Sequence, residues 1–487
     1  MEATCVSRKD RIMETQKTQK SERNLNVAGS LCIILLVFTT IIAGIRMGIG
    51  IEMSMLLGAT ESMFACIFLR KPWEHVEKSM LDFLSGTLVV IIILVDVGVM
   101  VGCWIIGGTV PALMYYGLKL IRPAIVVPMT FILCSVMSIF TGTSFGSIAT
   151  MGLALTGVAV GIGVPIPLVA GAAVAGAHVG DKMSPMSDST NLCSAVSKVG
   201  LYEHIGSMMH TTVPAAIISI IIYFVLGMKY TGEGSEENVT LMLNTLSEHF
   251  NINILCLVPA ILMLVISIKK IPAVLGLTSC AVFSMFWAML MQHAPFVSVM
   301  KAAYSGYVSE TGVQMVDGIL TRGGMSSMMG TVGMMIVACM MGGALQATGA
   351  LTIVMNTVME KFMKTPKSLV IVTIFYNYLI LAVSGNQMLG AVMSGPTFSD
   401  TYDKMNVHRK VLSRCMGDTT INGSALIPWS TATVYAMGVL GTGNAAFIPY
   451  EFFCYIVPIF TVIAALTGWA TWHSDGTPFN APKEKKA

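Results

Sequence analysis

Long apolar runs alternate with short polar segments along this chain of 487 residues, a pattern typical of repeated membrane spans. Runs of spanning length fall at 28–46, 49–70, 86–108 and 205–228. Residues 71–83 are amphipathic, and we expect them to lie at the membrane interface. A shorter apolar segment, 110–121, comes before Pro123.

The apolar stretch from Ala124 to Gly161 contains one polar interruption, Thr141 to Ser144. The arms on either side have about 18 residues each, near the lower limit for spanning a bilayer. Two interpretations follow. The arms are two spans joined by a tight loop, or they form a re-entrant hairpin whose tip lies inside the membrane.

A second interruption, Gly176 to Ser194, combines charges with a helix break between apolar segments. It holds Asp181, Lys182 and Asp188, and Pro185 prevents an unbroken helix because it lacks an N–H. Charged, broken helices at membrane depth are tolerated only where they are buried in protein or line a wet cavity, and they usually mark a transport site. The alternative is a cytoplasmic loop with solvated charges.

The same pattern returns after the polar, acidic segment 229–252. Segments that match in order lie about 240 residues apart. They are Gly86–Val89 with Gly330–Gly333, Thr141–Ser144 with Ser384–Gln387, Gly180–Asp181 with Gly417–Asp418, and Pro214 with Pro458. We therefore predict an internal duplication. An odd number of spans in each half would place the halves upside down relative to each other, with both termini on one side.

Most Lys and Arg residues fall where this arrangement places the cytoplasm, as the positive-inside preference requires; Lys119 and Arg122 are exceptions. The predicted fold is an all-α polytopic membrane protein of two inverted repeats. Each repeat has about five transmembrane helices, a re-entrant hairpin and one discontinuous helix. The predicted regions are a cytoplasmic tail (1–27), the first repeat (28–228), an extracellular loop (229–252), the second repeat (253–470) and a cytoplasmic tail (471–487).

Composition agrees with a membrane protein, since 54% of residues are hydrophobic and 11% charged, against about 25% charged in soluble proteins. The net charge of +3 does not indicate nucleic acid, because the basic residues lie at span ends. The eleven cysteines are scattered without a CxxC pair, so we expect neither a disulfide framework nor a metal cofactor. Gly142–Gly146 fits G-x-S-x-G, but membrane helices flank it instead of a strand-to-helix elbow, which disfavours a hydrolase using Ser144.

Inverted repeats bring hairpin tips and broken helices together near the membrane midplane. The expected ion- or substrate-binding residues are Thr143, Ser144, Asp181, Ser184, Asp188, Thr190, Asn191, Asn386, Gln387, Asp418, Thr419, Asn422 and Ser424. This oxygen-rich set suits a hard cation such as Na⁺, with Asp181, Asp188 and Asp418 as its expected ligands. A partly buried aspartate that holds either Na⁺ or H⁺ would exchange one for the other.

Three further ionisable residues are candidates for proton relay. Asp96 lies within an apolar run, where an ionisable group is costly. Glu61 is a weaker candidate in the second span, since it could pair with a polar neighbour on a helix face. His178 lies three residues before Asp181 on one helical face, although a packing role is the alternative. Lys182 either contributes to the site or pairs with one of its acids.

Several motifs resemble those of the NhaC-type Na⁺/H⁺ antiporters. They are Gly108–Pro111, Tyr115–Lys119, Thr141–Ser144, Gly180–Pro185, Ser187–Leu192 and Leu426–Trp429. The resemblance covers about 28–470 and implies a multi-pass transporter of a prokaryotic plasma membrane with re-entrant hairpins. It further implies lipid, Na⁺ and H⁺ as partners, no cofactor, no nucleic acid and, by analogy, a homodimer. The family also includes malate–lactate exchangers.

Two positions depart from the family pattern as the resemblance defines it. Asn386 stands where an acid is usual, and Gly417–Ile421 differs from the usual EDSGT. The leading hypothesis is Na⁺/H⁺ antiport. The second is cation-coupled exchange or uptake of a small carboxylate or amino acid, which Lys182 and helix N-termini would hold.

Overall fold

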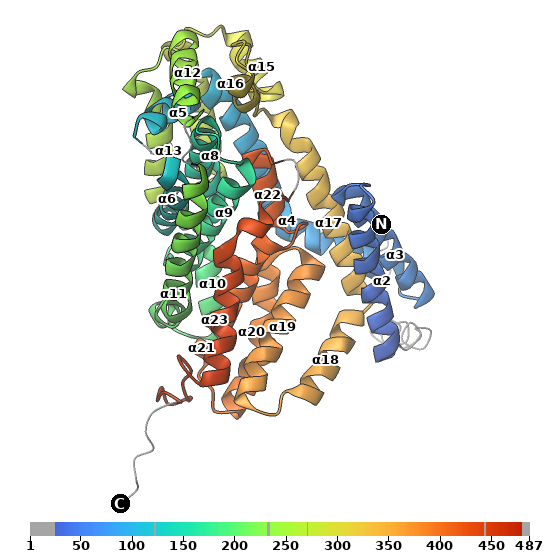
Figure 1. The fold of residues 1–487 in the computed structure, drawn as a ribbon. Helices are drawn as coiled ribbons and strands as arrows, with labels where there is room; N and C mark the ends of the chain where they lie inside the picture. Colours follow the sequence, from blue (N-terminus) through green and yellow to red (C-terminus); the bar gives the residue numbers. More distant parts are fainter. Residues whose placement is uncertain (1–24, 121–122, 231–233, 270, 443–444, 480–487) are drawn as a thin grey trace, which may run out of the picture. The chain divides into compact units, whose positions relative to one another are not determined.

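The computed structural model describes residues 25–120, 123–230, 234–269, 271–442 and 445–479 (Figure 1). Within these ranges the chain is helical, with two isolated bridges, Tyr307 with Arg322 and Trp472 with Pro478. Most of the predicted N-terminal tail, the last residues of the C-terminal tail, and Arg122 lie outside the described residues.

The first half of the chain forms α2 (Val27–Arg46), α3 (Ile51–Phe68), α4 (Trp73–Ile106), α5 (Thr109–Leu120), η1 (Pro123–Ile125), α6 (Val126–Thr141), α7 (Ser144–Ser147), η2 (Ile148–Gly152), α8 (Leu153–Gly161), α9 (Ile166–Met183), α10 (Asp188–Ser197), α11 (Leu201–Gly227) and η3 (Met228–Tyr230). After α12 (Gly234–His249) come η4 (Ile254–Leu257), α13 (Val258–Ile268), α14 (Ala273–Met291), α15 (Phe296–Ser305), α16 (Gln314–Leu320) and η5 (Met325–Met328). The chain continues through α17 (Met329–Ala347), α18 (Ala350–Phe362), α19 (Pro366–Ser384), α20 (Gln387–Lys404), α21 (Arg409–Met416), η6 (Gly417–Ile421), η7 (Ser424–Leu426), α22 (Thr431–Leu440), η8 (Ile448–Tyr450) and α23 (Phe452–Thr467).

Among the described residues, eight helices are long and apolar enough to cross a membrane, and a ninth if one bent pair is counted. The bent pair is Val239–His249 with Ile254–Ile266, at 95°. These lengths confirm the prediction of an all-α polytopic membrane protein. The inverted orientation of the two repeats and their boundaries stay predictions.

The structure changes two local predictions. The amphipathic segment 71–83 is continuous with the span that follows it, because α4 runs unbroken from Trp73 to Ile106, and its location at the membrane interface stays a prediction. Pro72 comes just before this helix and no proline lies within it, so nothing in the sequence ends it early. The predicted loop 229–252 contains α12, since no glycine or proline interrupts the chain between Ser235 and His249.

The two predicted hairpin tips share one backbone conformation. Gly142 ends α6 with φ 70°, and Gly385 follows α19 with φ 62°. Each glycine is followed by an extended residue, Thr143 or Asn386, which begins the next helix. A positive φ favours glycine, so both sharp turns are encoded locally. The depth of these tips in a membrane stays a prediction.

The chain forms two compact units. One unit consists of the described residues up to Thr87 together with Ile336–Met363 and Val383–Gly385. Within it, a small apolar cluster is formed by Cys66, Val76, Ala344 and Ala347.

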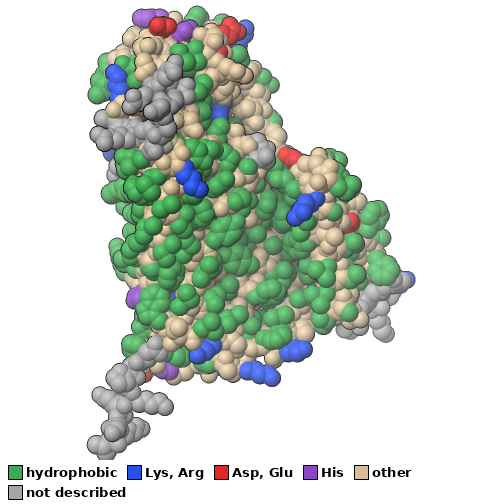
Figure 2. Space-filling model, in the orientation of Figure 1, with side chains coloured by type: hydrophobic (Ala, Val, Ile, Leu, Met, Phe, Trp, Pro, Cys, Tyr) green, Lys and Arg blue, Asp and Glu red, His purple; other side chains and the backbone are tan. Residues whose placement is uncertain are grey.

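The other unit consists of Leu88–Met335, Lys364–Ala382 and the described residues from Asn386 onward. It contains the broken helices and all site residues described below except Glu61. Hydrophobic side chains of α11, such as Ile217 and Ile221, are more than half exposed, and green side chains cover this part of the face in Figure 2. Such a surface suits lipid.

Candidate functional site

Helix α9 approaches α6 closely because glycines line its contact face. A Cβ atom added to Gly180 would lie 2.5 Å from the Ile139 nitrogen and 2.5 Å from the Ser135 oxygen. At Gly176, four residues earlier, it would meet the backbone of Phe131. Small residues spaced by four let two membrane helices touch through their backbones. This contact places the end of α9 beside the tip that follows α6.

The carboxylate of Asp181, near the end of α9, is buried and surrounded by hydroxyl groups. Ser144 Oγ, from the first tip, donates to Asp181 Oδ2 at 2.9 Å. Ser187 Oγ and Ser189 Oγ, from the break after α9 and the start of α10, lie 2.5 and 3.1 Å from Oδ1. Ser144 was predicted as a site residue, and the structure places it directly on Asp181.

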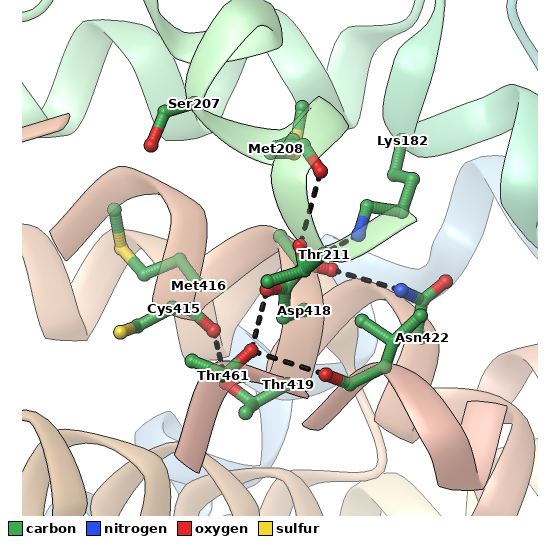
Figure 3. Close-up of polar contacts among 12 residues, drawn as sticks. Lys182, Ser207, Met208, Thr211, Cys415, Met416, Asp418, Thr419, Asn422 and Thr461 are labelled. Atoms are coloured by element: carbon green, nitrogen blue, oxygen red, sulfur yellow. Dashed lines mark hydrogen bonds and ion pairs between the residues drawn. The ribbon is translucent and has the colours of Figure 1, made fainter. Parts of the chain in front are cut away.

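The next residue, Lys182, joins the two broken helices. Its Nζ atom forms a fully buried ion pair with Asp418 Oδ1 in η6. Figure 3 shows both side chains and Thr461 of α23 directed toward one another, and Thr461 Oγ1 donates to Asp418 Oδ2 at 2.6 Å. Asp181 and Asp418 are thus held near each other, inside the protein, through adjacent residues of α9.

The second broken helix is stabilised by amide and hydroxyl groups of α19 and α20. Asn377 Nδ2 donates to Thr419 Oγ1 at 2.7 Å, and Ser394 Oγ donates to Asn377 Oδ1. Ser424 Oγ donates to Gln387 Oε1 at 2.8 Å. These bonds surround η6, a π-helical turn, and such turns occur often at functional sites.

Asn422, just after η6, has a buried Oδ1 atom without a hydrogen-bond partner among the described residues. The Asn422 Nδ2 atom lies 3.4 Å from the Gly417 oxygen, its one polar contact in Figure 3. A buried amide oxygen with free lone pairs is a ligand that a cation can use.

The first tip also touches the second broken helix. Tyr435 of α22 donates from its hydroxyl to the Phe145 carbonyl oxygen at 2.9 Å, and the two rings are 4.6 Å apart. Residues nearly 300 positions apart in sequence therefore meet at one site. The first tip and the end of the second broken helix are therefore in contact, while the inverted arrangement of the two halves stays a prediction.

Some predicted binding residues support the backbone instead of facing the carboxylates. Thr190 Oγ1 lies 2.8 and 3.0 Å from the carbonyl oxygens of Asp181 and Lys182. Ser184 Oγ donates to the Ile139 carbonyl oxygen at 2.7 Å. Both hydroxyls satisfy carbonyls that the end of α9 leaves without intrahelical partners.

The tip residues Thr143 and Asn386 each precede a helix, but only the Asn386 side chain caps it. Asn386 Oδ1 accepts from the Met388 nitrogen at 2.9 Å and caps α20. The Thr143 carbonyl oxygen accepts from Ser147 Oγ at 3.1 Å. A capping side chain uses its oxygen on the backbone, so it lends less to an ion.

Asp188 is not brought together with the other two aspartates. It is exposed in the first turn of α10, where the helix dipole favours a carboxylate. Among the described residues, no three His, Cys, Asp or Glu side chains form one metal-binding group. Asn191 lies one turn further and donates to the Ser187 carbonyl oxygen at 2.8 Å.

The three relay candidates lie in separate places. Asp96 Oδ2 accepts from Thr278 of α14 at 2.8 Å, and Glu61 Oε1 accepts from Thr40 of α2 at 2.7 Å. His178 is fully buried one turn before Asp181. Its Nδ1 atom lies 2.8 Å from the Val174 oxygen, while its Nε2 atom has no hydrogen-bond partner among the described residues.

Several residues at the site were missing from the predicted set. They are Ser187 and Ser189 beside Asp181, Lys182 and Thr461 beside Asp418, and Asn377 beside Thr419. Lys182 had been considered as a partner of an acid, and this alternative is the geometry observed. The other signal available in the sequence was polarity within apolar runs, which marks Asn377 in α19 and Thr461 in α23.

These features define a membrane transporter, with two broken helices meeting at buried charges. The chain belongs to the Na⁺/H⁺ antiporter family, whose model matches residues 176–469 and so includes both broken helices. The family is one of transporters, described by the exchange of Na⁺ for H⁺.

Similar proteins have different transport names. The malate-2H⁺/Na⁺-lactate antiporter of Bacillus subtilis is 31% identical over 93% of this chain and 97% of the relative. The Na⁺/H⁺ antiporter NhaC of Alkalihalophilus pseudofirmus is 30% identical over 88% and 95%. The arginine/ornithine antiporter ArcD of Halobacterium salinarum is 30% identical over 90% and 91%.

Proposed function

We propose that this protein exchanges Na⁺ for H⁺ across a membrane, the two cations competing for carboxylates at the broken helices. The observation that carries the proposal is the surroundings of Asp181. Its buried carboxylate accepts hydrogen bonds from hydroxyls, while the neighbouring ammonium of Lys182 is bound to Asp418. A buried carboxylate without a cation is costly, and either Na⁺ or H⁺ removes that cost.

The hydroxyls around Asp181 supply the remaining ligands for Na⁺ in this proposal. Each of Ser144, Ser187 and Ser189 now lies within 3.1 Å of a carboxylate oxygen. A serine hydroxyl has one proton and two lone pairs, so it can rotate from donating to the carboxylate to coordinating a cation. Oxygen ligands without thiolates suit a hard ion.

The pair of Lys182 and Asp418 gives this exchange a second proton-carrying group. Asp181 and Lys182 are consecutive residues of α9, so a Na⁺ ion on Asp181 would add positive charge to the buried surroundings of the Lys182 ammonium. Repulsion in a buried site favours loss of the ammonium proton. Na⁺ binding and proton release would thereby be linked.

The test is Na⁺-driven proton movement in proteoliposomes containing a pH-sensitive dye. We expect Asp181→Asn to abolish it, because the amide has no charge for Na⁺ to neutralise. We expect Ser144→Ala to weaken apparent Na⁺ affinity by about 10- to 100-fold, as for other groups that orient a metal ligand.

Asp400→Asn is the matched control, since the Asp400 side chain is 86% exposed on α20. It should transport at the rate of the unmodified protein. Full-rate Na⁺/H⁺ exchange by Asp181→Asn would refute the proposed site.

The same proposal includes the location and orientation of the chain. We place the protein in a prokaryotic plasma membrane as inverted repeats, with both termini cytoplasmic and 229–252 outside, because Lys and Arg are concentrated on one side in that arrangement. A membrane-impermeant cysteine reagent should label a cysteine introduced at exposed Gly476 only from the cytoplasmic side. Labelling from outside would reverse the assignment. A homodimer is proposed by family analogy, to be checked by mass in detergent.

A second candidate function, exchange of a small carboxylate, is favoured by Arg414. This guanidinium is fully buried in α21, one turn before Asp418. Its Nη1 atom donates to the Ala470 oxygen at 2.5 Å, but Nε and Nη2 have no hydrogen-bond partner among the described residues.

Another arginine of this chain shows what the Nε and Nη2 atoms of a guanidinium bind. Arg409 uses the same two atoms, Nε and Nη2, to hold both carboxylate oxygens of Asp403, at 3.0 and 2.6 Å. The free edge of Arg414 therefore matches a carboxylate in two-point geometry. Malate, lactate, arginine and ornithine, named for two relatives, all contain this group.

Uptake of labelled malate, lactate and ornithine into Na⁺-loaded proteoliposomes tests this candidate. Arg414→Lys keeps the positive charge but removes the paired N–H donors of the guanidinium. It should therefore reduce carboxylate uptake and leave Na⁺/H⁺ exchange unchanged. No uptake of any carboxylate by the unmodified protein would count against solute exchange while leaving cation antiport standing.

A further inference from the structure

A third buried acid, Glu451, lies at the start of α23 and has no part in the site described above. Its side chain is fully buried. The segment before Glu451 is hydrogen-bonded to α11, because the Tyr223 hydroxyl donates to the Tyr450 carbonyl oxygen at 2.7 Å. Helix α9 also packs closely here, since a Cβ atom added to Gly171 would lie 2.9 Å from the Phe447 oxygen.

Neither carboxyl oxygen of Glu451 has a hydrogen-bond partner among the described residues. The Cys454 thiol, a weak donor, is the side chain that contacts the carboxyl group. Tyr223 of α11 and Tyr455 of α23 are the other described titratable groups that interact electrostatically with this acid. An unpaired, buried carboxylate is costly, so the neutral acid is the form that fits these surroundings.

One face of α23 connects Glu451 with the buried ion pair of Lys182. Cys454 lies three residues after Glu451, on the same face and about 4.5 Å further along the helix axis. Cys454 interacts electrostatically with Lys182, and Lys182 Nζ lies 5.9 Å from the centre of the Phe453 ring. Phe453 and Cys454, in the first turn of α23, thus lie between the acid and the Lys182 amine.

We propose that Glu451 is a proton-binding site of the transporter, which passes protons between the Lys182 amine and water at the start of α23. The inference rests on the proposed Na⁺/H⁺ exchange and adds a route for its proton. Glu451 needs no cavity for this role, because its ligand is a single proton. A structural acid at this place would be expected to have strong hydrogen-bond donors, and apart from the weak Cys454 thiol Glu451 has none among the described residues.

The transfers balance in two steps. When water reaches the start of α23, neutral Glu451 gives its proton to a water molecule and becomes a carboxylate. The Lys182 ammonium then loses one proton to a water molecule that enters the first turn of α23, and this water gives one of its protons to the Glu451 carboxylate. The products are a neutral amine and a carboxylic acid, and no group is oxidised or reduced. Na⁺ bound at Asp181 promotes the second step because it repels the ammonium.

Two exchange reactions separate the proton route from the Na⁺ site. Na⁺/H⁺ exchange needs both, whereas Na⁺/Na⁺ exchange, followed with labelled Na⁺ in proteoliposomes, needs only the Na⁺ site. Glu451→Gln keeps the side-chain shape but cannot release a proton. We expect it to slow Na⁺/H⁺ exchange by at least about tenfold and to leave Na⁺/Na⁺ exchange unchanged.

Two further variants complete the experiment. Glu451→Asp should restore part of the Na⁺/H⁺ exchange with an altered pH profile, which a packing role would not produce. Glu310→Gln makes the same chemical change at an exposed position and should leave both reactions intact. Unchanged Na⁺/H⁺ exchange in Glu451→Gln would overturn the inference, and so would equal loss of both reactions. Absence of both reactions in the unmodified protein would instead refute the proposed function.

Discussion

Asp181 and Asp188 lie in one sequence stretch but have opposite surroundings. Asp181 is buried among hydroxyls, whereas Asp188 is exposed at the first turn of α10. In an exposed position, water already solvates the carboxylate, so a Na⁺ ion gains little by binding there. At the scale of single residues, burial and not residue type separates the two.

This difference gives a prediction for Asp188→Asn in the proteoliposome assay. We expect Na⁺-driven proton movement to persist, with a loss of stability of about 0.3–1 kcal/mol from the weaker interaction with the α10 dipole. Thermal unfolding in detergent measures the second effect. Complete loss of transport would restore Asp188 to the set of Na⁺ ligands.

The sequence predicted the residues whose polarity stands out from an apolar background. Asp181, Asp418 and Ser144 were identified in this way, and the structure places them at one site. Thr461 was missed because a threonine in a membrane helix usually bonds its own backbone, and only tertiary packing turns it toward Asp418.

Among the elements, the glycine face of α9 determines how the site is assembled. Gly180→Ala would place a methyl group against the backbone of α6 at Ser135 and Ile139. We expect a loss of about 1–3 kcal/mol in unfolding free energy, as for other overpacked sites. Gly206→Ala in α11 is a suitable control, because an added Cβ meets nothing within 4 Å there. Equal thermal stability of the two variants would contradict this account.

Element boundaries were less predictable than element identities. The sequence predicted α2 and α3 nearly to their ends, because glycines and a proline mark them. It did not predict the length of α4 or the presence of α12, since amphipathic or polar segments have weak apolar patterns. The π-helical turn η6 had no sequence signal beyond its glycine.

For the whole molecule, the predicted class of protein follows from composition alone. More than half of the residues are hydrophobic, and the described helices include eight of spanning length. The particular cargo does not follow in this way, because related chains of about 30% identity are named for Na⁺, malate, lactate and arginine. In the proposed carboxylate exchange, the free edge of Arg414 is one buried group on which such a difference would depend.

Asp181 and Lys182 are consecutive, yet they bind opposite partners. One is held by the first tip and the start of α10, the other by the second broken helix. A single peptide unit, stiff and planar, joins the two residues. A shift of that unit when Asp181 binds a cation would also move Lys182, so we expect occupancy at Asp181 to alter the pairing of Lys182 with Asp418.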